Sequence, residues 1–184
     1  NVTKTQSIAT KEIFGSTNKR INVILKRPVI ERRILSALNA NPSRIPVLLG
    51  GCGSGRTSLL LRVAETLGKD SSQYFDIERA TSTPEGFCSS ITRESPYRLV
   101  PTNEGGPPAR LGHDDARSAF ASVLRFLREA RSSDGHVPVF LIDELLELRA
   151  FESFPGLRRI QREVIETLET SPNRFVVSTR YTNR

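Results

Sequence analysis

The sequence contains no tryptophan and no methionine among its 184 residues, and only two cysteines, Cys52 and Cys88. Two cysteines are too few for the disulfide framework that stabilises small secreted domains. We identify no secretory signal pattern, so we expect a reducing, cytoplasmic setting. No apolar run approaches the roughly 20 residues of a membrane-spanning helix, so we expect no membrane span. Because residue 1 is Asn and methionine is absent, we expect the chain to be a piece of a longer protein.

Acidic residues are fewer than basic ones, with 20 against 27, and the formal net charge is +7. Residues 1–45 hold nine Lys or Arg and two Glu, whereas residues 46–184 hold eighteen of each sign. The positive excess therefore lies in the first quarter of the chain, which could contact nucleic-acid phosphates. Its only aromatic residue is Phe14, although single strands bind by stacking on aromatic side chains. A solvated arm, or one that docks on an acidic neighbouring subunit, explains the same charges equally well.

The spacing of apolar residues divides the chain into a basic N-terminal arm, residues 1–25, and one core, residues 26–184. Six of the twelve residues at 101–112 are Gly or Pro, which predicts an exposed loop. In the core we expect helices at 29–38, 57–67, from 83, from 113 and over 157–168, and strands at 45–49, 74–77, 136–142 and 174–179. Strands and helices alternate, which predicts an α/β fold, a three-layer α/β/α sandwich with a parallel sheet.

Two of the expected strands are continuous apolar runs. Residues 136–142 are nearly all apolar, which is typical of a parallel strand that helices cover on both faces. Residues 45–49 form a shorter apolar run that ends in glycines, and we expect this strand to be buried as well. Both strands lead directly into polar or glycine-rich segments, which are the candidate functional sites.

The first of these segments is the glycine-rich loop Gly50-Gly51-Cys52-Gly53-Ser54-Gly55-Arg56-Thr57. Its spacing is that of a phosphate-binding P-loop, with Arg56 in the position usually held by Lys. Glycines let successive backbone N–H groups converge on phosphate oxygens, the helix after Gly55 adds its positive end, and the Thr57 hydroxyl can bind Mg²⁺. We interpret Cys52 as a small filler residue. The alternative is a tight strand-to-helix connection without a ligand.

The second segment is the acidic pair Asp143-Glu144, which ends the apolar strand at 136–142. A carboxylate in this position can hold Mg²⁺, and a second one beside it can act as a general base that polarises the attacking water. Acidic residues after strands are also common at the first turn of a helix. The P-loop some ninety residues earlier favours the functional interpretation.

The third segment is Ser178-Thr179-Arg180, at the end of the last expected strand. The carboxyl edge of a parallel sheet is where α/β folds bind ligands. Polar side chains here would therefore point toward the terminal phosphate of a bound nucleotide. An exposed strand end is the alternative explanation.

Together these motifs resemble the P-loop ATPases of the AAA+ and STAND groups. Residues 50–57 are similar to Walker A, residues 140–144 to Walker B, and residues 177–180 to the sensor-1 strand in its Thr-Arg form. Lys26 and Arg27, with the helix behind them, resemble the segment that precedes the P-loop and packs near the adenine. The resemblance covers residues 26–184.

The sequence departs from that pattern in two ways. Arg56 keeps the positive charge but presents a longer, planar fork in place of a flexible ammonium, so nucleotide binding could survive while the geometry for hydrolysis suffers. The sequence also stops after the fourth strand, so we expect the fifth core strand, the lid, sensor 2 and the arginine-finger position to lie outside it.

The resemblance implies an ATPase module in which Mg-ATP hydrolysis is coupled to conformational change or assembly, with ATP and Mg²⁺ as cofactors and self-association or a larger assembly as the partner. The expected site residues are Gly50, Gly51, Cys52, Gly53, Ser54, Gly55, Arg56, Thr57, Ser58 and Thr179 for the nucleotide, Thr57 and Asp143 for Mg²⁺, and Glu144, Arg56 and Arg180 for catalysis. The first alternative is a switch or scaffold subunit that binds ATP or ADP but scarcely hydrolyses it. The second is a nucleic-acid-associated ATPase that uses the basic arm.

Overall fold

The computed structural model describes residues 27–80, 83–93, 95–99 and 115–180. The expected arm at 1–25 and the expected loop at 101–112 lie outside these described residues. The elements are α1 (Pro28–Leu38), β1 (Val47–Gly50), α2 (Arg56–Leu67), β2 (Ser72–Asp76), α3 (Ile77–Ala80), α4 (Pro84–Arg93), β3 (Arg98–Leu99), α5 (Ala116–Glu129), β4 (Ala130–Arg131), β5 (Val139–Asp143), the 3-10 helix η1 (Leu145–Ser153), α6 (Ile160–Thr170) and β6 (Arg174–Arg180).

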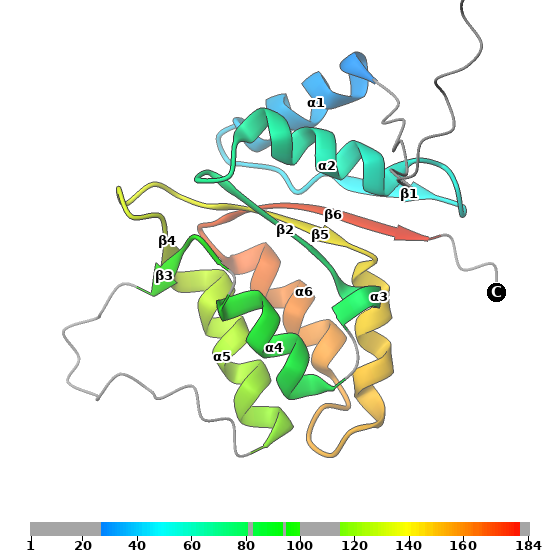
Figure 1. Ribbon diagram of the computed structural model, residues 1–184, viewed down its shortest axis with the longest axis vertical. Helices are drawn as coiled ribbons and strands as arrows, with labels where there is room; N and C mark the ends of the chain where they lie inside the picture. Colours follow the sequence, from blue (N-terminus) through cyan, green and yellow to red (C-terminus); the bar gives the residue numbers. More distant parts are fainter. Residues whose placement is uncertain (1–26, 81–82, 94, 100–114, 181–184) are drawn as a thin grey trace, which may run out of the picture.

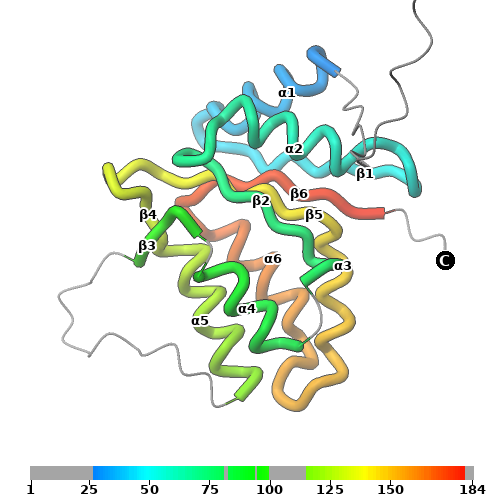
Figure 2. Tube along the Cα trace, in the orientation of Figure 1, coloured from blue at the N-terminus to red at the C-terminus, as the bar shows by residue number. Residues whose placement is uncertain are grey.

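Four strands form a parallel sheet in the order β1-β6-β5-β2. Helices α1 and α2 cover one face of this sheet, and α4, α5 and α6 cover the other (Figure 1). The expected α/β fold, a three-layer sandwich with a parallel sheet, is confirmed. The Cα trace in Figure 2 shows α1 and α2 side by side on their face of the sheet, at the end of the molecule where β1 lies.

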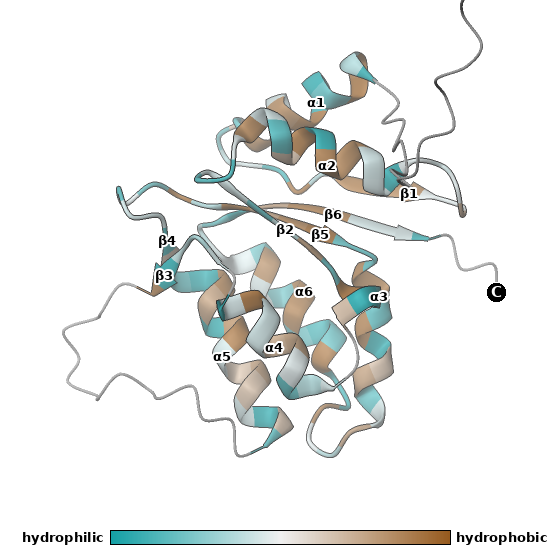
Figure 3. Ribbon diagram, in the orientation of Figure 1, coloured by the Kyte–Doolittle hydropathy of each residue, from teal (hydrophilic) through white to brown (hydrophobic). Residues whose placement is uncertain are grey.

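The two central strands supply side chains to both layers, because successive residues of a strand point to opposite faces. Phe140 and Ile142 belong to the larger core with α4, α5 and α6, whereas Val139 and Leu141 belong to the smaller core with α1 and α2. All five residues of β5 are buried, and hydrophobic residues follow β5 and β6 in Figure 3. The prediction of a strand covered on both faces is confirmed for β5.

The expectation that residues 45–49 form a buried strand is wrong for β1. Val47 and Leu49 are 54% and 53% exposed, because β1 lies at the edge of the four-stranded sheet and pairs only with β6. Leu48, which points to the opposite face, packs against the smaller core. An apolar run does not distinguish an edge strand from a central one, since that depends on which strands become neighbours.

Several element boundaries also differ from the expectation. The helix expected over 157–168 begins at Ile160, and Leu157 is buried in the turn that precedes it. The helix expected from 113 begins at Ala116, after Asp115, whose carboxylate accepts a hydrogen bond from the backbone N–H of Ser118 at 2.7 Å. Such capping by Asp is a local signal for a helix start. The antiparallel pair β3-β4 and the helix η1 were not predicted.

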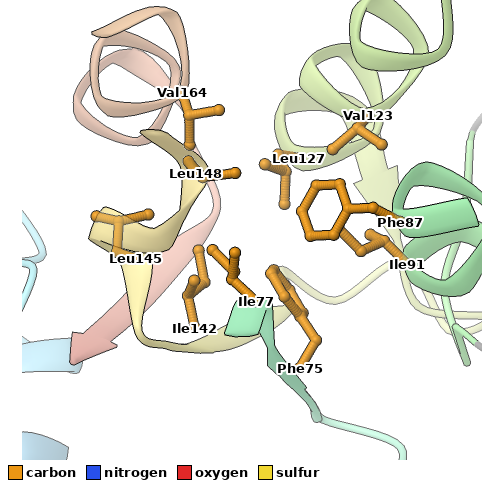
Figure 4. Close-up of a pocket in the computed structure, with 10 residues that line it drawn as sticks. All are labelled: Phe75, Ile77, Phe87, Ile91, Val123, Leu127, Ile142, Leu145, Leu148 and Val164. Atoms are coloured by element: carbon orange, nitrogen blue, oxygen red, sulfur yellow. The ribbon is translucent and has the colours of Figure 1, made fainter. Parts of the chain in front are cut away.

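One cavity lies inside the larger core, between the sheet and its helices (Figure 4). Its lining is entirely apolar: Phe75, Ile77, Phe87, Ile91, Val123, Leu127, Ile142, Leu145, Leu148 and Val164. With no polar group to orient a ligand, this cavity is a packing feature of the core. Among the described helices, none is long and apolar enough to span a membrane.

Candidate functional site

The carboxyl ends of the parallel strands bring all three sequence motifs to one edge of the sheet. Gly50, at the end of β1, pairs in register with Arg180 at the end of β6. Asp143 ends β5, which lies directly beside β6. Three segments far apart in the sequence therefore meet at a single place, where α/β sheets bind ligands.

The glycine loop between β1 and α2 depends on glycine at specific positions. Gly55 is the N-cap of α2 and has a φ of 80°, and Gly53 has a φ of 73°. Residues that carry a side chain rarely adopt this left-handed backbone conformation, which costs them roughly 1–2 kcal/mol. A Cβ on Gly50 would lie 2.6 Å from Ser54 Oγ, whereas a Cβ on Gly51 or Gly53 would meet nothing within 4 Å. The loop is therefore tight against Ser54 and open on its other side.

Arg27 connects α1 to this loop. Its Nη2 donates a hydrogen bond to the backbone carbonyl of Ser54 at 2.8 Å, and the same nitrogen would lie 3.3 Å from a Cβ on Gly55. Helix α1 is itself fixed against α2 through the smaller core, in which Ile34 and Leu38 take part. In the sequence, only a resemblance connects Arg27 with the glycine loop. In the structure, Arg27 holds this loop directly.

Arg56, in the first turn of α2, turns its side chain back across the loop toward β5. Its Nη2 donates a very short hydrogen bond to Glu144 Oε1, and its Nη1 donates to the carbonyl of Gly51 at 3.3 Å. The side chain is buried, and its Nε atom is buried without a hydrogen-bond partner. The guanidinium therefore sits between the glycine loop and the acidic pair, with its Nε atom unpartnered.

Glu144 is held by arginines on both carboxylate oxygens. In addition to Arg56 on Oε1, Arg180 Nε donates to Oε2 at 3.3 Å. Glu144 has a φ of 55° and precedes η1, but its side chain makes no capping hydrogen bond to that helix. Its backbone N–H donates to Ser178 Oγ at 3.2 Å. The alternative interpretation, in which the acidic pair only caps a helix, does not describe Glu144.

Asp143, the neighbouring carboxylate, is fully buried. Ser178 Oγ donates a very short hydrogen bond to its Oδ1, and Tyr74 OH donates to its Oδ2 at 3.0 Å. Burial and the adjacent Asp143 charge both raise the pKa of Tyr74 above its usual value, so the phenol stays protonated and continues to donate. Asp143 is thus fixed by two hydroxyl groups from the strands on either side of it.

Arg180 is surrounded by three glutamates, two of which lie outside the sequence motifs. Its Nη2 donates to Glu147 Oε1 of η1 at 2.9 Å and lies 3.0 Å from Glu78 Oε2 of α3. The hydrogen bond with Glu78, followed by the charge of Glu144, raises the pKa of Arg180 above its ordinary value. Glu78 and Glu147 belong to no motif, and no sequence signal distinguishes them from other exposed glutamates.

The remaining expected site residues have varied surroundings. Cys52 is exposed on the loop, with a free thiol. Thr57 and Ser58 are half-buried in the first turn of α2. Thr179 is 9% exposed and Ser178 is fully buried, whereas the side chain of Arg180, the last residue of β6, is 37% exposed. In the described part of the chain, no group of three or more His, Cys, Asp or Glu is placed to hold a metal ion.

Comparison with known proteins adds little to this geometry. No model of a known protein family matches the sequence, and no curated protein is significantly similar to it. The structure is similar to the Aeropyrum pernix ORC2 protein, solved as ADPNP-ADP complexes, with 18% identity and a TM-score of 0.43. The match covers 84% of this chain and 39% of that chain. At this level the likeness assigns neither an activity nor a ligand to the chain.

Proposed function

We propose that this chain is an ATP-binding P-loop module of the AAA+ and STAND type, in which Mg-ATP hydrolysis drives conformational change or assembly. The loop at residues 50–57 holds the phosphates together with Arg56. Glu144 is the general base for water, and Thr179 and Arg180 contact the terminal phosphate. The relevant partners are ATP, ADP and other subunits of an assembly.

The observation that carries the proposal is the meeting of Arg56, Glu144 and Arg180 beside an open glycine loop. The two arginines come from different elements and converge on the same carboxylate, although 88 and 36 positions separate them from Glu144. Charged groups that converge in this way at the carboxyl edge of a parallel sheet are typical of a site for an anionic ligand. A purely structural strand-to-helix turn needs none of them.

The residues fit a nucleotide phosphate chain with Mg²⁺. The loop is open at Gly51 and Gly53, and the buried Nε of Arg56 has no partner. The start of α2 has no side-chain cap, which leaves its first backbone N–H groups available to an anion. Thr57 and Asp143 are the residues that would hold Mg²⁺, with Asp143 acting through water. When bound, Mg²⁺ supplies positive charge to the phosphate oxygens. Ser178 and Tyr74 keep Asp143 in place.

The proposal is tested by measuring Mg-ATP binding and multiple-turnover phosphate release. We expect binding in the micromolar to millimolar range and a loss of turnover of about 100-fold or more in Glu144→Gln, because a general base contributes on the order of 10²–10⁴-fold. Glu152→Gln, in the η1 helix that Glu144 precedes but outside the described contacts of the site, is the matched control. Absence of ATP binding by the folded protein would remove the proposal, and turnover unaffected by Glu144→Gln would remove the role of Glu144.

A second candidate is a nucleotide-bound switch or scaffold that hydrolyses ATP very slowly. The specific observation in its favour is that both oxygens of Glu144 already accept hydrogen bonds from arginines. With both oxygens engaged by guanidinium groups, the carboxylate has to break one of these hydrogen bonds before it can accept a hydrogen bond from an attacking water. In such a switch, bound nucleotide stabilises the fold by about 2.7 kcal/mol when its concentration is 100 times Kd.

The variant Arg56→Lys separates the two candidates. Lysine presents a compact ammonium in place of the fork that reaches both Gly51 and Glu144. A large increase in ATP turnover would favour the switch, because the native arginine then suppresses hydrolysis. A loss of turnover would favour the ATPase, with Arg56 as its working phosphate ligand. Mg-ATP affinity is measured on the same protein, so that binding and chemistry are read separately.

A further inference from the structure

Arg180 is bound by three carboxylates, one from the residue between β5 and η1, one from η1 and one from α3. Its Nε faces Glu144, which follows β5, while its Nη2 reaches Glu147 in η1 and Glu78 in α3, at 2.9 and 3.0 Å. The guanidinium is therefore directed to the acidic side of the site and away from the glycine loop. Because Glu147 and Glu78 bind the outer nitrogen, they hold the end of the side chain that a ligand would have to recruit.

We propose that Glu147 and Glu78 are positioning residues that hold Arg180 on Glu144. By doing so they lower the preference of the site for nucleoside triphosphate over nucleoside diphosphate. The proposal rests on the proposed function, because it concerns the same nucleotide site. Neither glutamate touches the phosphates in this scheme. Both act only through Arg180.

The direction of the effect follows from a competition for one guanidinium. In this scheme a terminal phosphate draws Arg180 away from Glu147 and Glu78, which hold its Nη2, so these carboxylates oppose the binding of a triphosphate. A diphosphate lacks that phosphate and leaves Arg180 where it is. Removing the competing carboxylates should therefore strengthen triphosphate binding and leave diphosphate binding unchanged.

The size of the effect follows from exposure. The side chains of Arg180, Glu147 and Glu78 are 37%, 42% and 54% exposed, so water screens these ion pairs. Glu144, by contrast, is 10% exposed and is also held by Arg56. Removing Glu147 or Glu78 should therefore change the ratio of triphosphate to diphosphate affinity only moderately. Glu144 is the more firmly held partner of Arg180.

The test measures Kd for Mg-ADP and for a slowly hydrolysed ATP analogue on the full chain. We expect Glu147→Gln to raise the preference for the triphosphate analogue about two- to fivefold, the range for a partly exposed ion pair. The double variant Glu78→Gln with Glu147→Gln should raise it further. The Kd for ADP should stay within twofold of the wild-type value in both. The control Glu152→Gln should change neither Kd.

A double-mutant cycle with Arg180→Gln tests whether the glutamates act through Arg180. In the Arg180→Gln background, Glu147→Gln should leave the affinity ratio unchanged, because the side chain it controls is gone. An equal change in both Kd values, or the same gain without Arg180, would overturn the inference and indicate a general structural role. If the wild type binds both nucleotides and Glu147→Gln leaves the ratio unaltered, the inference fails alone. If the folded wild type binds neither, it fails together with the proposed function.

Discussion

The guanidinium of Arg56 donates a hydrogen bond to the carboxylate of Glu144, and the two side chains are only 9% and 10% exposed. Arg56 begins α2 after the glycine loop, and Glu144 follows the central strand β5. The residue that departs from the usual P-loop pattern is therefore paired directly with the expected general base. In the proposed function this ion pair would connect phosphate binding to the availability of the base, and it also bears on stability.

Replacement of Arg56 should destabilise the fold, because it leaves a buried carboxylate with less positive charge around it. Breaking a buried ion pair by removing one partner costs on the order of 3–5 kcal/mol, and we expect Arg56→Gln to lie at the lower end because Arg180 still binds Glu144. Urea unfolding measures the change. Arg162→Gln, which removes an exposed ion pair with Glu166 in α6, should cost less than about 1 kcal/mol. Equal losses of unfolding free energy in the two variants would show that the buried ion pair stabilises the fold no more than the exposed one.

Gly55 and Gly51 should respond differently to the same substitution. Gly55→Ala forces a side chain into a φ of 80° and toward Arg27 Nη2 at 3.3 Å, so we expect a loss of about 1–2 kcal/mol in unfolding free energy. Gly51→Ala adds a methyl group in open space and should change stability by less than about 0.5 kcal/mol. Thermal or urea unfolding of the two variants provides the comparison. A Gly51→Ala loss as large as that of Gly55→Ala would contradict the loop geometry.

The two cysteines should differ strongly in reactivity. Cys52 is exposed in the glycine loop, whereas Cys88 is buried and burial raises the pKa of its thiol to about 12. At pH 8 we expect one thiol per folded chain to react with a maleimide and two per unfolded chain. If residues 50–57 hold the phosphates, saturating Mg-ATP should slow the labelling of Cys52 several-fold, whereas Mg²⁺ alone should not. Labelling at an unchanged rate with ATP bound would place the nucleotide elsewhere.

Stability should fall at alkaline pH because of Cys88. Its pKa is raised from 9.0 to about 12 in the fold, first by burial and then by the charge of Glu85. The unfolded chain therefore loses this proton at a lower pH than the folded one, so the contribution is fully present below pH 9 and is lost as the pH rises toward 12. Unfolding free energies between pH 7 and 11 should decline less steeply for Cys88→Ala than for the wild type. Parallel profiles would show that Cys88 does not control the decline.

The apolar cavity should make the core around it sensitive to truncation. Leu148, in η1, lines the cavity and is 1% exposed. Leu148→Ala enlarges an existing void that its neighbours do not fill, so we expect a loss of about 3–5 kcal/mol, the upper part of the range for such changes. Leu61→Ala removes a side chain that is 38% exposed on α2 and should cost about 1 kcal/mol or less. Similar losses would indicate that the region around Leu148 collapses to fill the space.

Much of the fold was predictable from the sequence because its signals are local. The run that forms β5 is apolar over contiguous residues, Asp115 caps α5 within one turn, and the glycine spacing at residues 50–57 sets the turn between β1 and α2. Element boundaries were less predictable, since η1 occupies part of the segment before α6. The exposure of Val47 and Leu49 was missed because it depends on the edge position of β1.

The sequence by itself determined the alternation of strands and helices, the glycine loop and the presence of acidic and basic residues at strand ends. These features are set by the spacing of neighbouring residues and by the backbone freedom of glycine. Only the tertiary structure decided that Arg56 and Arg180 share Glu144 and that Glu78 and Glu147 bind Arg180. The physical reason is the strand order β1-β6-β5-β2, which places residues from distant segments at one edge of the sheet.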